Sequence, residues 1–145
     1  MKIHQISIIT LVCVMLFAVG SNWAGDSTTQ QSQSLLPRSV LKLIIDHPIL
    51  APFLHSEISD RVPLVVSDHL LEPGVTPSKF DQPLRIIRDR EVGAQPHLRI
   101  LSFEMSGSRA KALIEYKVEG VEALFNLERD SKGWWTVIDA RIIEH

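Results

Sequence analysis

The sequence is nearly devoid of cysteine, since its only one is Cys13 in the apolar stretch near the N-terminus. That stretch has the pattern of a cleavable signal, so the mature protein is expected to contain no thiol and no disulfide. Cysteine nucleophiles, zinc–thiolate sites and redox-active cysteine pairs are thereby excluded. A small exported domain without disulfides must rely on its hydrophobic core, which favours a bacterial periplasm over an extracellular setting.

Recognised catalytic motifs are also missing. The chain has no Gly-x-Ser-x-Gly elbow to hold a serine nucleophile, and no Gly-x-Gly-x-x-Gly or Walker-type loop to hold a nucleotide. Basic residues are not in excess either, because 15 Lys and Arg stand against 17 Asp and Glu. We therefore expect no cofactor, and no nucleic acid or anionic lipid as a partner.

Histidines and carboxylates gather between residues 46 and 69, but without the spacing of a known metal or catalytic motif. His-Glu-x-x-His is absent, and Asp46-His47 and Asp68-His69 fit helix capping and turn formation equally well. We assign no catalytic residue and no metal site. The alternative that stays open is a pocket-type enzyme or ligand carrier that uses His47, His55 or His69.

Residues 1–24 have the three parts of a secretory signal peptide. Lys2 supplies the positive charge, residues 6–19 form the apolar core, and Ala18-Val19-Gly20 places cleavage near residue 20, with Ala24 as a second position. The core is shorter than the roughly 20 apolar residues that span a bilayer. The sequence therefore predicts a periplasmic or secreted protein. An uncleaved anchor in the inner membrane is the alternative.

Downstream of the signal, composition separates a linker from one domain. Residues 25–34 are polar and of low complexity, which is typical of a flexible linker, and residues 35–145 suffice for a single core. Apolar spacing between residues 36 and 55 predicts two short helices separated at Pro48. The apolar run 62–66 contains Pro63, which indicates an edge strand.

Residues 97–144 read as four consecutive strands joined by short turns. Ser106-Gly107-Ser108, Glu119-Gly120 and residues 130–133 are turn sequences between runs of β-branched and aromatic residues. The sequence therefore predicts an α+β fold. Short N-terminal helices would pack on a curved, mainly antiparallel sheet that ends in a four-strand meander.

Turn positions also predict the register of these strands. A turn at Gly107-Ser108 sets Glu104 opposite Lys111, and a two-residue turn at Glu119-Gly120 sets Tyr116 opposite Ala123. Trp134 would then face the core. Alternation places several apolar residues on the outer face, where polar ones are expected. This predicted ligand or partner patch comprises Leu98, Ile100, Leu113, Leu124, Trp135 and Val137.

The C-terminal third contains Gly-Ser-Arg-Ala-Lys-Ala, an alternating strand, and then Phe-Asn-Leu-Glu-Arg-Asp-Ser-Lys-Gly-Trp-Trp-Thr-Val-Ile-Asp-Ala. Residues 97–144 thereby resemble the closing hairpins of nuclear-transport-factor-2-like or cystatin-like α+β domains. In that superfamily helices pack into a curved sheet that can enclose a pocket, and members serve as enzymes, ligand binders or assembly parts. This chain departs from the pattern because its helices are short and broken by Pro48. The resemblance transfers no catalytic residue.

The sequence is compatible with three functions. The absence of catalytic motifs and the apolar outer patch favour a non-enzymatic periplasmic protein that binds a partner or a small apolar ligand. A small-ligand carrier or enzyme of the nuclear-transport-factor-2-like type is the first alternative. A membrane-anchored component of an envelope or secretion complex is the second. Expected partners are another envelope protein or a second copy of the chain, with membrane contact only through an uncleaved signal.

Overall fold

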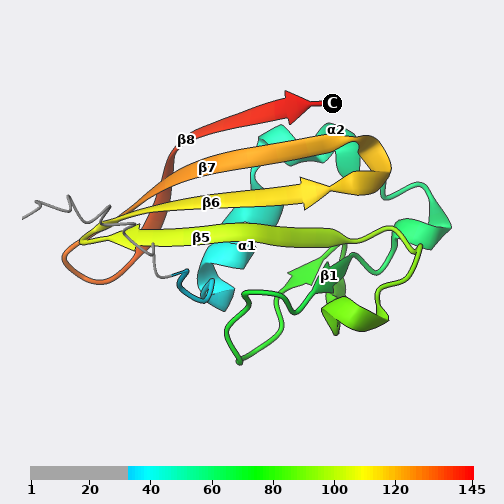
Figure 1. Cartoon of the computed structure of the whole chain (residues 1–145), viewed down its shortest axis with the longest axis horizontal. Coiled ribbons are helices and arrows are strands. Elements are labelled where there is room, and N and C mark those ends of the chain that lie inside the picture. Colours follow the sequence, from blue (N-terminus) through cyan, green and yellow to red (C-terminus); the bar gives the residue numbers. More distant parts are fainter. Residues whose placement is uncertain (1–32) are drawn as a thin grey trace, which may run out of the picture.

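A computed structural model describes residues 33–145 (Figure 1). The predicted signal at residues 1–24 lies outside the described residues, as does most of the predicted linker. The helical elements near the N-terminus are α1 (Arg38–Asp46), the 3-10 turn η1 (Pro48–Leu50) and α2 (Ala51–Leu54). The main sheet contains β1 (Val65–Ser67), β4 (Arg85–Ile87), β5 (Leu98–Ser106), β6 (Arg109–Tyr116), β7 (Val121–Arg129) and β8 (Trp135–Glu144). A separate pair is formed by β2 (Ser78–Lys79) and β3 (Gln82–Pro83).

Helix α1 forms because its apolar residues recur at helical spacing, and it ends just before Pro48. Four of its side chains are fully buried and form one stripe against the sheet, namely Val40, Leu41, Ile44 and Ile45. Each such side chain contributes about 1.5–3 kcal/mol by leaving water. His47 has an extended backbone, and its Nδ1 accepts a hydrogen bond from the Ile49 N–H, which starts η1.

The main sheet has six strands in the order β4-β1-β5-β6-β7-β8 and is mainly antiparallel. Strand β1 pairs in parallel with β4 and with β5, whereas the neighbours from β5 to β8 are antiparallel. The expectation of an edge strand at residues 62–66 is wrong, because β1 lies between two others. Pro63 precedes the first residue of β1, so the ladder loses no N–H donor.

The pairing of β5 with β6 explains one error in the predicted outer patch. Glu104 lies opposite Lys111, which confirms the register at the turn, but the register shifts between Ile100 and Ser102. This bulge adds one residue to β5 and reverses the faces of everything before it. Leu98 and Ile100 are consequently 0% exposed in the core, so their predicted place on the outer face is wrong.

Strands β6 and β7 are joined by four residues rather than two. The 3-10 turn η4 (Lys117–Glu119) is followed by Gly120 at φ 66°, a left-handed conformation that glycine adopts without steric cost. Tyr116 therefore lies opposite Val121 instead of Ala123. The predicted register is wrong by two residues, but the faces are unchanged because side chains alternate with a period of two.

A second bulge lies between β7 and β8 and changes the faces of two predicted patch residues. Asn126 pairs with Asp139 and Leu127 pairs with Val137, which leaves Ile138 as the additional residue. Trp135 and Val137 accordingly pack against the core, and their predicted outer placement is wrong. Trp134 is 71% exposed, so the prediction that it faces the core is also wrong.

Candidate functional site

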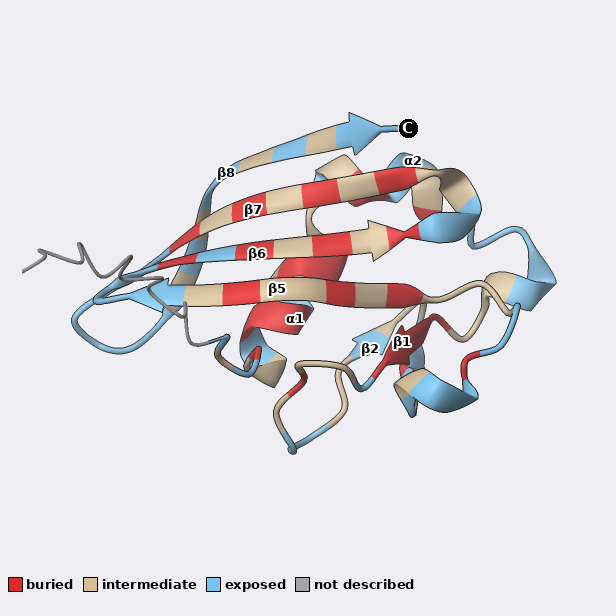
Figure 2. Ribbon diagram, viewed as in Figure 1, coloured by how far each residue is buried: buried red, intermediate tan, exposed pale blue. Residues whose placement is uncertain are grey.

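The outer face of the sheet is the surface that the helices leave open. Helices α1 and α2 both lie behind the strands β5 to β8, against the inner face (Figure 1). Along β6 and β7 buried and half-buried residues alternate, which marks the inner and outer faces (Figure 2). Leu113 and Leu124 are half-buried on the outer face and lie directly opposite each other. Two of the six predicted patch residues therefore remain on this face.

Polar rows flank this leucine pair. On one side Glu104 lies opposite Lys111, and the Asn126 Nδ2 donates a hydrogen bond of 3.0 Å to the Asp139 carboxylate. On the other side Glu115 lies opposite Glu122 in the β6–β7 pairing. Like charges placed directly across a strand pair repel each other, but Arg99 lies opposite Glu115 on β5 and the His145 ring lies 3.4 Å from Glu122, so this row contains both acidic and basic groups.

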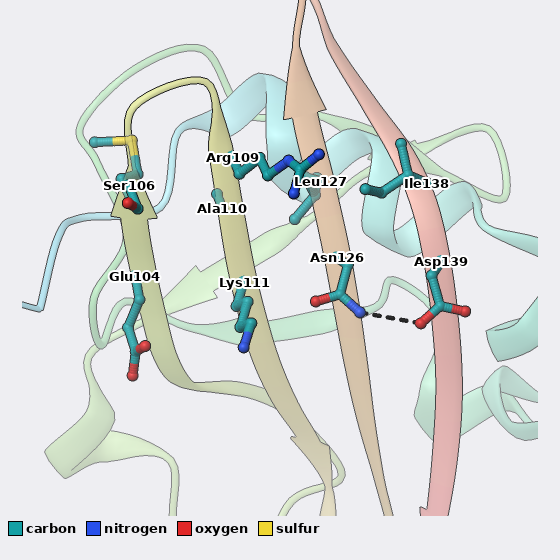
Figure 3. A pocket seen from close by; sticks show the side chains of 10 residues that line it. Glu104, Ser106, Arg109, Ala110, Lys111, Asn126, Leu127, Ile138 and Asp139 are labelled. Carbon is teal, nitrogen blue, oxygen red and sulfur yellow. Dashed lines mark hydrogen bonds between the residues drawn. The ribbon is translucent and has the colours of Figure 1, made fainter.

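A hollow of about 590 Å³ opens on the sheet beside the first polar row, near the β5–β6 turn (Figure 3). All four strands from β5 to β8 line it. The side chains that give it its character are Glu104, Met105, Arg109, Lys111, Ile138 and Asp139. Acidic, basic and apolar groups thus line the hollow together. That set suits a segment of polypeptide better than a purely apolar molecule.

Sequence reasoning missed Ile138 as a member of this surface. It is 53% exposed, and in Figure 3 its side chain extends from β8 toward β7. The alternation pattern placed Ile138 in the core because it assumed an unbroken strand. Ile138 is itself the additional residue of the bulge, which places it on the outer face, and no motif in the sequence marks the bulge.

A polar cluster joins β1 to β5 at the other end of the sheet. The fully buried Ser67 hydroxyl donates to Asp89 at 2.7 Å, and the Arg99 guanidinium lies 3.0 Å from the second oxygen of Asp89. The Ser67 hydrogen bond holds the pKa of Asp89 below its ordinary value. Desolvation opposes this effect, and the Arg99 charge adds to it. The cluster resembles a nucleophile–carboxylate pair only in composition, because the Ser67 hydroxyl is buried and already donates to the carboxylate.

The lowered pKa of Asp89 predicts sensitivity to acid. The ionised Asp89 carboxylate is favoured in the folded chain, so it stabilises the fold at pH values above its unfolded-state pKa, including neutral pH. Below that pKa the unfolded chain binds the proton more readily than the folded chain does. The contribution is lost as the pH falls through the folded-state pKa. We expect Asp89→Asn to show a smaller loss of stability than the native protein between pH 6 and pH 3, measured by urea unfolding. Asp60→Asn, at an exposed carboxylate, is the control. If Asp89→Asn lost as much stability as the native protein over this pH range, the Asp89 carboxylate would not be the source of the acid sensitivity.

A second charged cluster fastens the segment after α2 to the turn between β6 and β7. Arg61 forms an ion pair with Glu119, and its guanidinium lies 5.9 Å from the centre of the Tyr116 ring. Burial raises the pKa of the Tyr116 hydroxyl, with the Glu119 carboxylate adding to the shift and Arg61 opposing it. His55 lies 2.7 Å from Glu57 and 3.7 Å from Glu119. These contacts connect two surface turns.

The histidines named for an enzyme or carrier do not share a site. His47 packs edge-on against Phe125 at 5.5 Å between ring centres, whereas His55 contacts Glu57. The backbone N–H of His69 donates to the Ser67 hydroxyl. Among residues 33–145 no group of three or more His, Cys, Asp or Glu side chains is arranged to hold a metal ion. The structure therefore adds no geometry that favours this alternative.

Within the described part of the chain, no helix combines the length and apolar character needed to cross a membrane. Comparisons with protein-family models, with curated proteins and with solved structures each find no match to the chain. The outer face and its hollow are therefore the features of this chain that bear on its function.

Proposed function

We propose that this chain is an exported, non-enzymatic protein that binds another envelope protein through the outer face of β5 to β8. Export follows from the predicted signal at residues 1–24, and the periplasm is the proposed location. The observation that carries the binding proposal is the leucine pair, Leu113 and Leu124, on a sheet face that neither α1 nor α2 covers. Apolar side chains rimmed by polar groups are characteristic of recognition surfaces.

The hollow supports the choice of a polypeptide partner. Glu104 and Asp139 carry hydrogen-bond acceptors, Arg109 and Lys111 carry donors, and Ile138 adds an apolar side chain to the lining of the same 590 Å³. An extended segment presents its own donors, acceptors and side chains along one line. The proposed architecture behind this face is a curved four-strand meander carrying short N-terminal helices on its concave side. It retains the proposed likeness to nuclear-transport-factor-2-like or cystatin-like domains.

The Leu124→Glu variant tests the binding surface. A half-buried outer position tolerates the change at a cost of less than about 2 kcal/mol, while a carboxylate beside Leu113 removes the apolar contact. We expect the native protein to recover a defined partner from an envelope extract and Leu124→Glu to recover at least about tenfold less. Lys132→Glu, in the exposed β7–β8 turn, is the matched control.

Equal recovery by all three proteins would show that the leucine pair is ordinary surface and would overturn the proposal. Circular dichroism and urea unfolding of each protein separate a lost contact from a lost fold.

Intact-mass measurement on protein from the periplasm tests the proposal that the chain is exported. A mature N-terminus near Ser21 or Gly25 supports cleavage, whereas the full-length mass supports the anchored alternative.

A further inference from the structure

The free edge of β8 is the longest unpaired backbone edge of the main sheet. Strand β8 has ten residues, pairs with β7 on one side and has no strand on the other among residues 33–145. The opposite edge of the sheet is β4, which has only three residues. Exposed edges are commonly protected by lysine, proline, other charged residues or bulges; β8 contains no lysine or proline, and it carries three charged residues and the bulge at Ile138. A ten-residue edge without lysine or proline can pair with another strand whose charges complement its own.

The hydrogen-bond pattern shows which backbone groups of β8 face this edge. The His145 N–H donates to the Gly120 carbonyl at 3.0 Å, so odd-numbered residues after the bulge direct their N–H and C=O groups toward β7. Even-numbered residues alternate with them along an antiparallel pair. The backbone groups of Ala140, Ile142 and Glu144 therefore point toward the free edge.

We propose that β8 pairs antiparallel with β8 of a second copy of this chain, around a two-fold axis at Ala140. The pairing joins the two main sheets edge to edge. Ala140 lies opposite itself, and its outward N–H and C=O groups bond across the axis. Asp139 of each copy then lies opposite Arg141 of the other, so the interface contains two ion pairs related by symmetry.

Faces and charges select this register over its neighbours. A shift of one residue would place core-facing Ala140 opposite outer-facing Arg141. The inner face of one sheet would then be continuous with the outer face of the other. A shift of two residues in one direction places Asp139 opposite Asp139, and in the other direction Arg141 opposite Arg141. Like charges directly across a strand pair are unfavourable. Among the registers centred near Ala140, the proposed one alone pairs opposite charges.

Apolar residues extend the contact on both sides of the axis. Ile142 is partly buried against the core, and the proposed register places it beside Val137 and Ile138 of the second copy. The bulge at Ile138 lets two residues of one strand meet one of the other. Pairing around a two-fold axis also occupies the β8 edge of both copies, so neither can bind a third copy through β8 and the assembly is a dimer.

A charge-exchange experiment on the full chain tests the pairing. Sedimentation equilibrium over concentrations up to about 1 mM measures the dissociation constant of the native dimer. Arg141→Asp and Asp139→Arg each place like charges opposite one another twice, so each variant should dimerise at least about tenfold more weakly. An equimolar mixture of the two variants pairs opposite charges again and should form a heterodimer. Lys132→Asp makes the same charge change as Arg141→Asp but lies outside the interface.

Three results would overturn the proposal. These are a native chain that stays monomeric throughout the series, single variants that dimerise as the native chain does, and a mixture that stays monomeric. Circular dichroism confirms that each variant is folded. Because this readout is the mass of the chain alone, its failure is distinguishable from failure to capture an envelope partner.

Discussion

Ile100→Glu should prevent the chain from folding, while Leu113→Glu should leave it folded. Ile100 is 0% exposed and lies opposite Ile114 in the core, so a glutamate there removes apolar burial and places an unpaired carboxylate away from water. Together these effects cost about 5 kcal/mol or more, which is comparable to the whole stability of a small domain. Leu113 is half-buried on the outer face, where a carboxylate remains hydrated.

Strict alternation along the strands places both residues on the same face and predicts similar effects. The bulge between Ile100 and Ser102 predicts opposite ones. Circular dichroism of the two purified variants, followed by urea unfolding of whichever is folded, distinguishes these outcomes. A folded Ile100→Glu variant with near-native stability would mean that the bulge is absent and that Ile100 faces solvent.

Phe125→Ala should reduce the stability of the folded chain by about 3–5 kcal/mol, the usual cost of removing a large buried aromatic side chain. Phe125 is 0% exposed at the centre of β7, with Ala112 and Ala140 as its neighbours on the adjoining strands. These small side chains cannot fill the cavity left behind. The substitution also removes the edge-on contact with the His47 ring, through which the residues after α1 pack on the sheet.

Urea unfolding measures this loss directly, and thermal unfolding should show a midpoint lower by about 10–25 °C. Asn126→Ala is the adjacent control on the outer face. It removes only the exposed hydrogen bond to Asp139 and should change stability by less than about 1 kcal/mol. If the two substitutions had equal effects, Phe125 would not lie at the centre of the core.

The chemistry of neighbouring residues was sufficient to predict a helix end, a turn and a strand pairing. The sequence placed the end of the first helix at Pro48, and α1 ends at Asp46. The turn at residues 130–133 follows from Asp130, whose carboxylate accepts hydrogen bonds from the backbone N–H groups of Lys132 and Trp134. The pairing of Glu104 with Lys111 followed from the short turn at Gly107. In each case the cause lies within a few residues.

The candidate site was predicted less completely, because the sheet face on which each of its residues lies depends on single-residue insertions within the strands. Leu113 and Leu124 were placed on the outer face, and they lie between the two bulges, where strict alternation holds. Leu98 and Ile100 lie on β5 before its bulge, and Trp135 and Val137 lie on β8 before its bulge, so each was assigned to the wrong face. No residue type marks a bulge in the way that proline marks a helix end or glycine a turn.

The sequence by itself determined the α+β class, the short helices, most turn positions and the inward face of the central strands. These follow from proline, glycine and the spacing of apolar residues, all of which act locally. Tertiary structure alone decided the four-residue turn before Val121 and the two bulges, and the bulges determine which side chains of β5 and β8 form the outer face. A bulge forms where packing across the sheet favours one additional residue, and that choice depends on strands that are distant in the sequence.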